Sequence, residues 1–266
     1  MLRIGWFSSG RDKAARDLLR TVQRAIKNGE LDAEVCFVFC NREYGESLES
    51  DRFLRLVKGY DLPLKTYSYK MFKNERGSCT PSQCLPPWRL DYDREVMKRI
   101  EDFDIDIGLL VGYMLIVGEE LCRKYRLLNL HPSIPDGPVG AWEDVVWQLI
   151  EEKAEKAGAM IHMVTPELDR GPALTYFTFS LNRPPFKKLW PALEGRTGNI
   201  RETPAAKSLF RTIRRYELAR EFPLVIATLK SLSHGLIRFE DGPLTGYDLS
   251  QEIEDMVDTR YRLSYE

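Results

Sequence analysis

The chain contains 266 residues, with 39 lysines and arginines against 40 aspartates and glutamates, so its formal net charge is −1. A chain of this length can bury a large hydrophobic core without disulfide bonds or metals to hold it together. The balanced charge argues against a surface built throughout to bind nucleic acid or an anionic membrane.

The sequence shows no sign of a membrane or secreted protein. No stretch approaches the roughly 18 to 20 consecutive apolar residues that a membrane helix requires. The first residues lack the basic head and long apolar run of a signal peptide. Five cysteines, an odd number, suit reduced thiols better than a disulfide framework. We therefore expect a cytoplasmic protein.

The first two-thirds of the chain alternates short apolar runs with segments whose apolar residues recur at helical spacing. The apolar runs predict strands over 2–7, 33–39, 62–67, 106–111 and 127–130. The helical spacing predicts helices over 12–28, 47–58 and 90–103, and a further helix ending near residue 125. Such an alternation implies right-handed crossovers. It predicts an α/β fold, an open, mostly parallel twisted sheet with flanking helices and a Rossmann-like N-terminal half.

Two more strands are predicted over 158–164 and 173–180, on either side of a turn. In open α/β sheets, ligands bind beyond the carboxyl ends of the strands. The segments 8–13, 112–117 and 131–140 therefore become the candidates for a functional site.

Two segments look like insertions into this pattern. The first, 68–88, has no periodicity and contains Cys79 and Cys84, whose spacing without a second cysteine pair makes a zinc site improbable. The second, 181–215, has nine basic and two acidic residues, and the stretch 240–258 has seven acidic residues and no basic ones. We expect a catalytic domain over 1–240, with insertions near 68–88 and 181–215, followed by an acidic, helix-prone tail over 241–266.

The most informative motif is the apolar run at 127–133, which contains Asn129 and His131. Residues two apart on a strand project from the same face. An Asn amide and an imidazole held together at the end of a strand can stabilise an oxyanion and move a proton. Strand geometry alone favours this interpretation no more than a capped strand end with a satisfied histidine. Asp169 lies in a tight turn after the strand that contains His162, and a carboxylate beside an imidazole raises its pKa and fixes its orientation.

Several segments spread along the chain resemble the formyltransferase family, and within it the branch that acts on glycinamide ribonucleotide. They are FSSG at 7–10, FVFCNR at 37–42, YDRE at 92–95, GYMLIVGEEL at 112–121, LLNLHPS at 127–133, IHMVTPELDRGP at 161–172 and FPLVIATL at 222–229. The ordered pair N-L-H-P-S and L-D-x-G-P is the specific part of this resemblance.

The resemblance implies a catalytic trio of Asn129, His131 and Asp169. An amine would attack the formyl carbon of 10-formyltetrahydrofolate, the formyl donor. Asn129 and protonated His131 would stabilise the oxyanion, and Asp169 would sustain the charge on His131 and help relay a proton through water. His162 would support this trio or be a structural histidine of the sheet, and His234 would be a capping or surface residue. No metal is required.

The resemblance also implies where the substrates bind. The folate would contact Tyr113, Met114, Leu115, Ile116, Val117 and Val164. The phosphate and amine of the acceptor would contact Gly10, Arg11, Asp12, Lys13, Gly112, Pro132 and Glu217. We expect small-molecule partners, a monomer or homodimer, and neither a membrane nor a nucleic acid partner.

The first departure from the family pattern lies after the first strand. The family's phosphate loop usually reads G-x-G-S, whereas this chain continues from Gly10 with Arg11, Asp12 and Lys13. The two basic side chains would supply charge where the backbone cradle is lost. Alternatively, Asp12 is the N-cap of the following helix in a solvated first turn.

Other departures also concern the substrates. Leu115 stands where the family commonly has arginine, and the loop after His131 is altered. The acidic residue expected to hold the acceptor amine aligns near Leu218, with Glu217 one position away. The pattern therefore predicts the catalysis more firmly than the acceptor.

Three other functions compete with transfer to glycinamide ribonucleotide. A 10-formyltetrahydrofolate hydrolase would use the same trio with water, but such enzymes generally have an extra N-terminal domain, and this chain opens directly on its first strand. A formyltransferase could also act on another amine, such as an amino-sugar nucleotide or methionyl-tRNA. An enzyme that binds tRNA would use 181–215 to contact phosphates, yet that segment has few aromatics to stack on bases. A non-catalytic relative would not need an intact trio.

Overall fold

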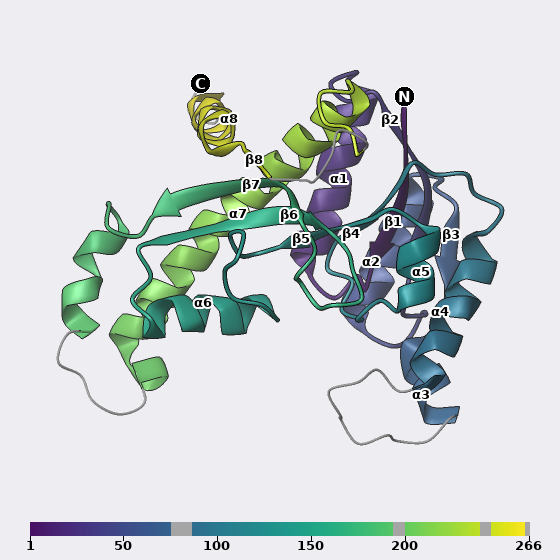
Figure 1. Ribbon diagram of the computed structural model, residues 1–266, viewed down its shortest axis with the longest axis horizontal. Helices are drawn as coiled ribbons and strands as arrows, with labels where there is room; N and C mark the ends of the chain where they lie inside the picture. The colour runs from purple at the N-terminus through teal and green to yellow at the C-terminus, as the bar shows by residue number, and fades with distance from the viewer. Residues whose placement is uncertain (76–86, 194–199, 240–245, 264–266) are drawn as a thin grey trace. The chain divides into compact units, whose positions relative to one another are not determined.

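The computed structural model describes residues 1–75, 87–193, 200–239 and 246–263 (Figure 1). Within these ranges, eight strands are hydrogen-bonded in the order β3-β2-β1-β4-β5-β6-β7-β8. The predicted α/β class, with a mostly parallel sheet and flanking helices, is confirmed. Cys79 and Cys84 lie outside the described residues.

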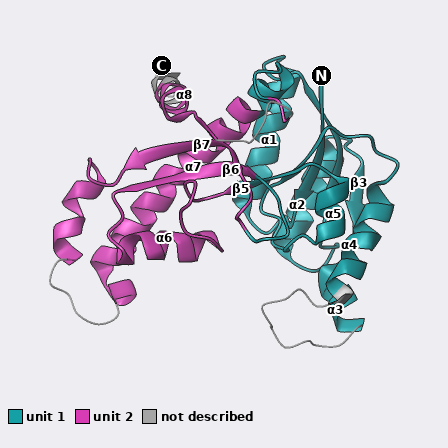
Figure 2. Ribbon diagram, in the orientation of Figure 1, with its two compact units in different colours: residues 1–129, 163–168, 229–237 teal, residues 130–162, 169–228, 238–266 magenta. Residues whose placement is uncertain are grey.

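The chain divides into two compact units, coloured separately in Figure 2. Unit 1 comprises Met1–Asn129, Met163–Leu168 and Leu229–Ile237, and unit 2 comprises Leu130–His162, Asp169–Thr228 and Arg238–Glu266. The division falls inside β5, between Asn129 and Leu130, so each unit is described by itself.

Unit 1 is a parallel sheet with helices between its strands. Its strands are β1 (Leu2–Ser8), β2 (Ala33–Cys40), β3 (Leu64–Thr66), β4 (Ile107–Leu110) and the first part of β5 (Leu127–His131). Its helices are α1 (Lys13–Lys27), α2 (Leu48–Gly59), α3 (Tyr69–Glu75), α4 (Pro87–Ile100) and α5 (Glu119–Lys124). The strand order reverses between β1 and β4, which is the kind of switch point where open sheets bind ligands.

The sequence explains where the first helices begin. Asp12 is the N-cap of α1, and its side chain accepts a hydrogen bond from the Ala15 amide. Ser47 caps α2 in the same way through the Ser50 amide. The apolar residues at helical spacing in α1 are buried against the sheet, as the periodicity predicts.

The core of unit 1 is rich in aromatic residues. Phe7 of β1 and Phe37 of β2 meet edge to face, with ring centroids 5.5 Å apart. Tyr92 of α4 and Tyr113 after β4 belong to the same buried cluster. Loops that follow β4 are thereby anchored on the core of unit 1.

Unit 2 contains an antiparallel hairpin and a long helix. Strands β6 (Lys156–Met163) and β7 (Ala173–Ser180) are antiparallel, and β8 (Tyr247–Asp248) pairs parallel to β7. The helices are α6 (Trp142–Glu151), α7 (Pro204–Ser233), α8 (Ser250–Leu263) and three 3₁₀ turns, η1 (Phe186–Lys188), η2 (Trp190–Leu193) and η3 (Ile200–Glu202). The last residue of β6 and the last turn of α7 are counted with unit 1.

Several elements differ from the sequence-based prediction at their ends. The third strand, predicted over 62–67, is β3 at Leu64–Thr66, and the helix predicted over 90–103 is α4 at Pro87–Ile100. A short helix, α3, forms in the segment 68–88, where no periodicity is present. Much of the described part of 181–215 is helical, because α7 begins at Pro204.

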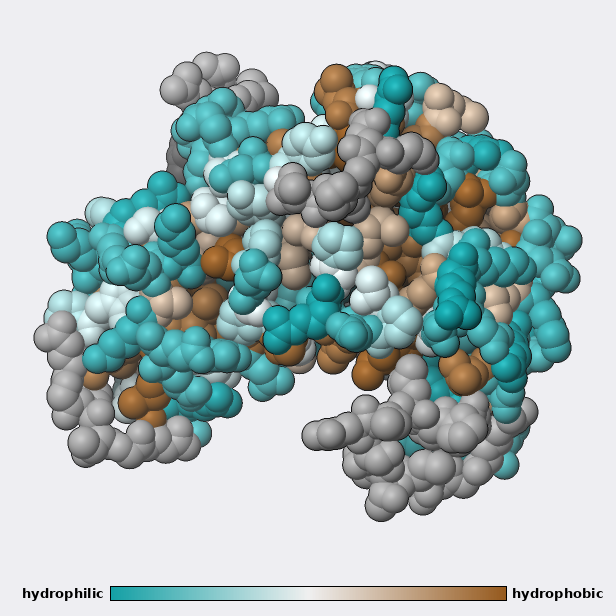
Figure 3. Space-filling model, in the orientation of Figure 1, coloured by the Kyte–Doolittle hydropathy of each residue, from teal (hydrophilic) through white to brown (hydrophobic). Residues whose placement is uncertain are grey.

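One face of the molecule shows how polar and apolar residues are distributed on the surface. On the face shown in Figure 3, hydrophilic residues cover most of what is visible, and hydrophobic residues appear in smaller groups. No helix in the described parts of the chain combines the length and the apolar character needed to cross a bilayer.

Candidate active site

Unit 2 brings together His131, His162 and Asp169. The Nδ1 atom of His131, at the end of β5, lies 3.6 Å from one carboxylate oxygen of Asp169. The Nε2 atom of His162, on β6, lies 3.6 Å from the other carboxylate oxygen. Both histidines are 2% exposed, so this cluster is withdrawn from water. The carboxylate of Asp169 thus faces an imidazole on each side.

Local backbone irregularities place two of these side chains. The register between β6 and β7 shifts between Ile161 and His162, and bulges of this kind re-aim side chains near functional sites. Asp169 has φ +51°, a left-handed conformation that costs free energy for a residue with a Cβ. Such a conformation persists only where the surroundings hold it.

The loop after β5 holds both members of the His131–Asp169 pair. The Nε2 atom of His131 lies 3.0 Å from the Pro138 carbonyl oxygen, to which an Nε2–H donates. The Gly140 amide donates to Asp169 at 3.2 Å. Gly140 has φ +106°, which favours glycine at this position. Both ring nitrogens of His131 therefore face an acceptor, which is the arrangement that favours an imidazolium.

Burial and pairing act in opposite directions on the pKa of His131. Burial lowers it, and Asp169 and the Pro138 carbonyl raise it, with a net shift below the ordinary value. For Asp169, burial raises the pKa, but contacts with His162, His131 and the Gly140 amide outweigh it and leave the pKa lowered. Asp169 is therefore ionised at neutral pH and available to stabilise positive charge on His131.

Asn129 precedes His131 by two residues on β5, and its backbone pairs with Leu110 of β4. The two residues belong to the same face of the strand by its two-residue period. An amide N–H and an imidazole N–H on one strand face can both donate to a single oxyanion.

The segment after β4 alternates buried and exposed side chains. Tyr113 and Val117 are buried in the core of unit 1, whereas Met114 and Ile116 are 45% and 40% exposed. Leu115 is partly buried against the same core. Apolar side chains directed to the surface at a sheet's ligand-binding edge can contact a flat aromatic ring.

Two hydrogen bonds join this segment to Ser9, which directly follows β1, and a third holds Val164 to β5. The Met114 amide donates to the Ser9 hydroxyl at 3.0 Å, and the Ser9 amide donates to the Gly112 carbonyl at 3.1 Å. Val164 lies partly buried against the core, and its amide donates to Leu127 at 2.8 Å. Unit 1 thus contains all six predicted folate-contacting residues.

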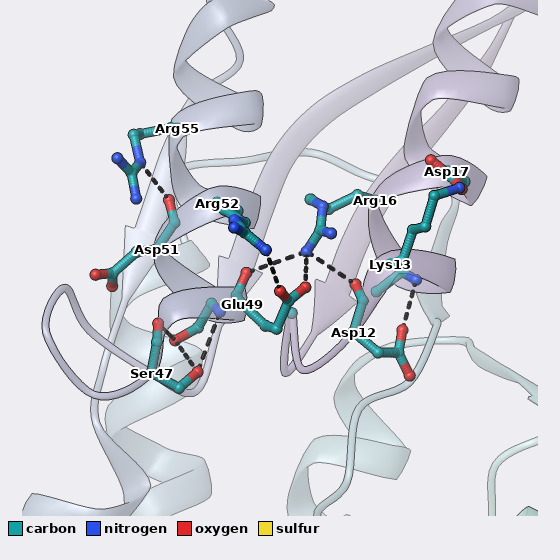
Figure 4. Close-up of polar contacts among 12 residues, drawn as sticks. Asp12, Lys13, Arg16, Asp17, Ser47, Glu49, Asp51, Arg52 and Arg55 are labelled. Atoms are coloured by element: carbon teal, nitrogen blue, oxygen red, sulfur yellow. Dashed lines mark hydrogen bonds and ion pairs between the residues drawn. The ribbon is translucent and has the colours of Figure 1, made fainter.

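Charged side chains in and beside the turn between β1 and α1 have partners within the chain, as Figure 4 shows. Asp12 accepts from the Ala15 amide at 2.9 Å, as an N-cap does. Lys13 pairs with Asp17 and Arg16 with Glu49. The alternative interpretation of this turn, with Asp12 as the cap, describes what the structure contains.

Gly10 is required at this turn by conformation and by space. Its φ is +55°, and a Cβ there would lie 2.8 Å from the ring of Phe53. The turn is therefore tight even without the second glycine of the family's phosphate loop. Whether a phosphate binds there stays a prediction, as it does for Gly112, with φ +60°, and for partly buried Pro132.

Glu217 lies on α7 and is fully buried. Neither of its carboxylate oxygens has a hydrogen-bond partner, and Arg214 Nη1 lies 3.6 Å away. Burial raises its pKa well above the usual range. A carboxyl whose pKa is raised in this way favours its neutral form more than an exposed carboxyl does, and its predicted role in holding the acceptor amine stays a prediction.

Glu221, one turn further along α7, is a functional candidate that the sequence did not reveal. It is buried and forms an ion pair with Arg214, whose guanidinium lies 4.8 Å from the centre of the Trp142 ring. Its negative charge also raises the pKa of His131. The only feature of the sequence that could have indicated Glu221 is its position directly before the FPLVIATL segment at 222–229.

No group of three or more His, Cys, Asp or Glu side chains in the described ranges is arranged to hold a metal ion. The buried thiol of Cys40 has a pKa raised to about 12 by burial, so it is not a reactive thiolate.

Comparisons with known proteins identify the family of the chain. A family model described as formyl transferase matches residues 3–178. Phosphoribosylglycinamide formyltransferase of Escherichia coli is 36% identical over 85 residues, which are 31% of this chain and 39% of that protein. Formyltetrahydrofolate deformylase of Haemophilus influenzae is 24% identical over 148 residues, 55% of this chain and 44% of that protein. The matched parts are less than half of either relative.

A solved structure has the same fold. Glycinamide ribonucleotide transformylase 1 from Symbiobacterium toebii superposes with a TM-score of 0.63, over 91% of this chain and 92% of that chain, at 21% identity. At this level of identity the likeness concerns the fold alone.

Proposed function

The chain belongs to the formyl transferase family, and from this membership we propose that it transfers a formyl group from 10-formyltetrahydrofolate to the amine of a small, phosphorylated acceptor. Glycinamide ribonucleotide is the leading candidate, because the relative from E. coli is named for that substrate. The reaction would belong to purine biosynthesis. The observation that carries the proposal is the buried His131–Asp169 pair at the end of β5.

The reaction begins when the acceptor amine attacks the formyl carbon. A carbon–nitrogen bond forms and the formyl oxygen becomes an oxyanion. The Asn129 amide and protonated His131 donate to this oxygen. In this step the oxyanion competes with the Pro138 carbonyl for the Nε2–H of His131.

Collapse of the intermediate requires a proton to move. The attacking nitrogen loses a proton, the bond from the formyl carbon to N10 of the folate breaks, and N10 takes up a proton. Asp169 stays ionised, sustains the charge on His131 and helps relay the proton through water. His162 holds Asp169 from its other side.

The donor binds on unit 1 in this proposal. Its flat pterin ring lies against the 113–117 segment, where Met114 and Ile116 present apolar side chains, and against Val164. Leu115 replaces the arginine common in the family, so one polar contact to the folate is missing. The Rossmann-like strand order of unit 1 supports this placement, because such sheets bind ligands at the carboxyl ends of their strands.

The acceptor contacts are proposed with changed roles at two positions. Gly10, Arg11, Lys13, Gly112 and Pro132 line the predicted phosphate and amine site. Asp12 acts as the helix cap rather than as a phosphate ligand. Glu217 is buried with a raised pKa, so we propose that Glu221, which pairs with Arg214 and acts electrostatically on His131, shares the acidic role on α7.

The remaining proposals concern the domain boundaries, the location and the partners of the protein. We propose that residues 1–240 form the catalytic domain and that 241–266 is an acidic tail. We also propose a cytoplasmic location, small-molecule partners and no nucleic acid partner, in a monomer or homodimer. We propose that the reaction requires no metal.

A second candidate is hydrolysis of 10-formyltetrahydrofolate, favoured by the similarity to the deformylase of H. influenzae. The two activities differ only in the nucleophile, which is an amine in one and water in the other. Release of tetrahydrofolate should be followed with and without glycinamide ribonucleotide. Product that depends on the amine supports transfer, and equal product without it supports hydrolysis.

The catalytic pair is tested by substitution. His131→Ala and Asp169→Asn are each expected to lower kcat by about a hundredfold or more, the scale of lost acid–base and oxyanion stabilisation. His234→Ala, at the end of α7, is the matched control and should retain normal turnover. Near-normal rates in both site variants would exclude this mechanism.

A further inference from the structure

A buried ion pair on α4 lies directly against the segment 113–118. Arg89 Nη1 donates to Asp93 Oδ1 at 2.5 Å, and the two side chains are 2% and 1% exposed. An ion pair shielded in this way from water is unusual, because removing two charges from water costs several kcal/mol per ion by general estimates. The pair therefore needs further partners to offset that cost.

Those partners are backbone groups of the segment itself. Arg89 Nη2 donates to the Ile116 carbonyl oxygen at 2.7 Å. Asp93 Oδ2 accepts from the Gly118 amide at 2.7 Å. The Ile116 carbonyl and the Gly118 amide are thus each held by one member of the same ion pair.

Close packing fixes this arrangement. A Cβ at Gly118 would lie 2.8 Å from Asp93 Oδ2 and 2.7 Å from Leu90, so the backbone of the segment approaches α4 as closely as glycine allows. The guanidinium carbon of Arg89 lies 5.0 Å from the centre of the Tyr92 ring and 5.6 Å from that of Tyr69. The rings hold the guanidinium plane in place.

The pair reaches the side of the segment opposite the exposed side chains of Met114 and Ile116. Tyr113 and Val117, on that inner side, are buried. A rotation or shift of the 116–118 backbone would change the positions of both exposed apolar side chains. The conformation that presents them depends on the two backbone contacts with Arg89 and Asp93.

We propose that Arg89 and Asp93 are positioning residues for the formyl donor: they fix the backbone of 116–118 from beneath, so that the apolar side chains of 113–117 are preorganised for the folate ring. This inference rests on the proposed function, which assigns the folate to that segment. Neither side chain touches substrate. Their effect is expected on donor affinity rather than on the chemical step.

The test uses Asp93→Asn and Arg89→Lys in the full chain. Asn keeps the shape but loses the charge, and Lys keeps the charge but cannot donate from a planar fork to Asp93 and Ile116 together. Arg94→Lys is the matched control, because Arg94 lies on the same helix and forms an exposed pair with Glu120. Thermal unfolding of each variant establishes that it is folded, and Asp93→Asn decides the outcome if Arg89→Lys does not fold.

Two readouts separate positioning from general stability. The dissociation constant of 10-formyltetrahydrofolate, measured by titration without acceptor, is expected to rise about tenfold or more in both variants. Hydrogen exchange at the Gly118 amide is expected to quicken by a similar factor, whereas exchange in β1 and β2 is unchanged. The KM for the acceptor and kcat at saturating donor should stay within about twofold, and Arg94→Lys should leave all values unchanged.

The inference is overturned if the folded variants bind the donor normally, or if the KM values for donor and acceptor rise together. Failure of the proposed function gives a different result. In that case the unchanged protein itself would not bind 10-formyltetrahydrofolate, whereas Gly118 exchange would still respond to the substitutions.

Discussion

His131 and Asp169 show how burial and pairing oppose each other at a single pair of residues. Burial lowers the pKa of His131, whereas the facing carboxylate and the Pro138 carbonyl raise it. The net result is a pKa below the ordinary value, and imidazole is the side chain whose ordinary pKa lies closest to neutral pH. Because the proposed mechanism uses the protonated form, its rate depends on how well Asp169 supports that form.

The pH dependence of kcat/KM follows from this balance. Activity that requires protonated His131 falls as the pH rises through its lowered pKa. Asp169→Asn removes the supporting charge. The decrease in kcat/KM should therefore occur at a lower pH, and the maximal kcat/KM should also be lower. Rate profiles, with an NMR titration of the His131 ring, measure the shift. A fall that stays in place or moves to higher pH in Asp169→Asn would contradict this role.

Stability is linked to the same pKa shifts. A histidine whose pKa is lowered on folding contributes stability above its unfolded pKa of about 6.5, and loses it as the pH falls. We therefore expect the free energy of unfolding to fall as the pH is lowered below about 6.5. His131→Gln should show a shallower fall, measured by urea unfolding at a series of pH values. An unchanged pH dependence would argue against burial as the cause.

Asp12 bears on the question of the acceptor. Its carboxylate caps α1 where a substrate phosphate would otherwise meet the helix amides. Asp12→Ser keeps a cap without the charge. It should lower the KM for glycinamide ribonucleotide about fivefold, the effect of removing about 1 kcal/mol of repulsion near water.

The dephosphorylated acceptor is the control for that variant. With it, Asp12→Ser should leave KM unchanged, because no phosphate meets the turn. Equal KM for the ribonucleotide in both forms of the enzyme would show that the phosphate binds elsewhere.

At the scale of the elements, the last helix is held to unit 2 by a polar contact with α7. Glu254 of α8 pairs with Arg220 through two hydrogen bonds of 2.9 and 2.7 Å. The Arg220 guanidinium also lies 3.3 Å from the centre of the Tyr216 ring. The short strand β8, just before α8, pairs with the edge of β7 that does not face β6.

Glu254→Gln is expected to destabilise the protein by about 1–2 kcal/mol, because it leaves the nearly buried Arg220 without its ionic partner. Urea unfolding measures the loss. Glu252→Gln, at an exposed position of the same helix, should change stability by less than about 0.5 kcal/mol. Equal stability of the two variants would mean that α8 is held by its apolar side chains alone.

At the scale of the whole molecule, charges of opposite sign pair locally, and this includes residues of the basic segment 181–215. Basic residues of 181–215 have acidic partners in unit 2: Arg183 pairs with Glu254, Arg201 with Glu151 and Arg214 with Glu221. Paired side chains lose part of their attraction for phosphates. This supports a small-molecule acceptor over a tRNA.

Periodicity predicted most of the parallel sheet and the α/β class, because strands and helices of unit 1 have one clear apolar side. The same-face placement of Asn129 and His131 followed from their spacing, and Asp169 from the resemblance to the family. The contacts of Pro138 and Gly140 could not be predicted, since backbone groups leave no mark on side-chain patterns. Burial of Glu217 and pairing of Glu221 depend on how α7 packs, which its helical spacing does not specify.

The fate of the formyl group shows whether the protein transfers it to an amine or releases it as formate. With 10-formyltetrahydrofolate labelled at the formyl carbon and glycinamide ribonucleotide in excess, the account predicts label in formylglycinamide ribonucleotide and little in formate. The same experiment with His131→Ala should give labelled product about a hundredfold or more slowly. If the label appears mainly as formate, at a rate that does not depend on the acceptor amine, the protein is a hydrolase and the proposed transfer is wrong.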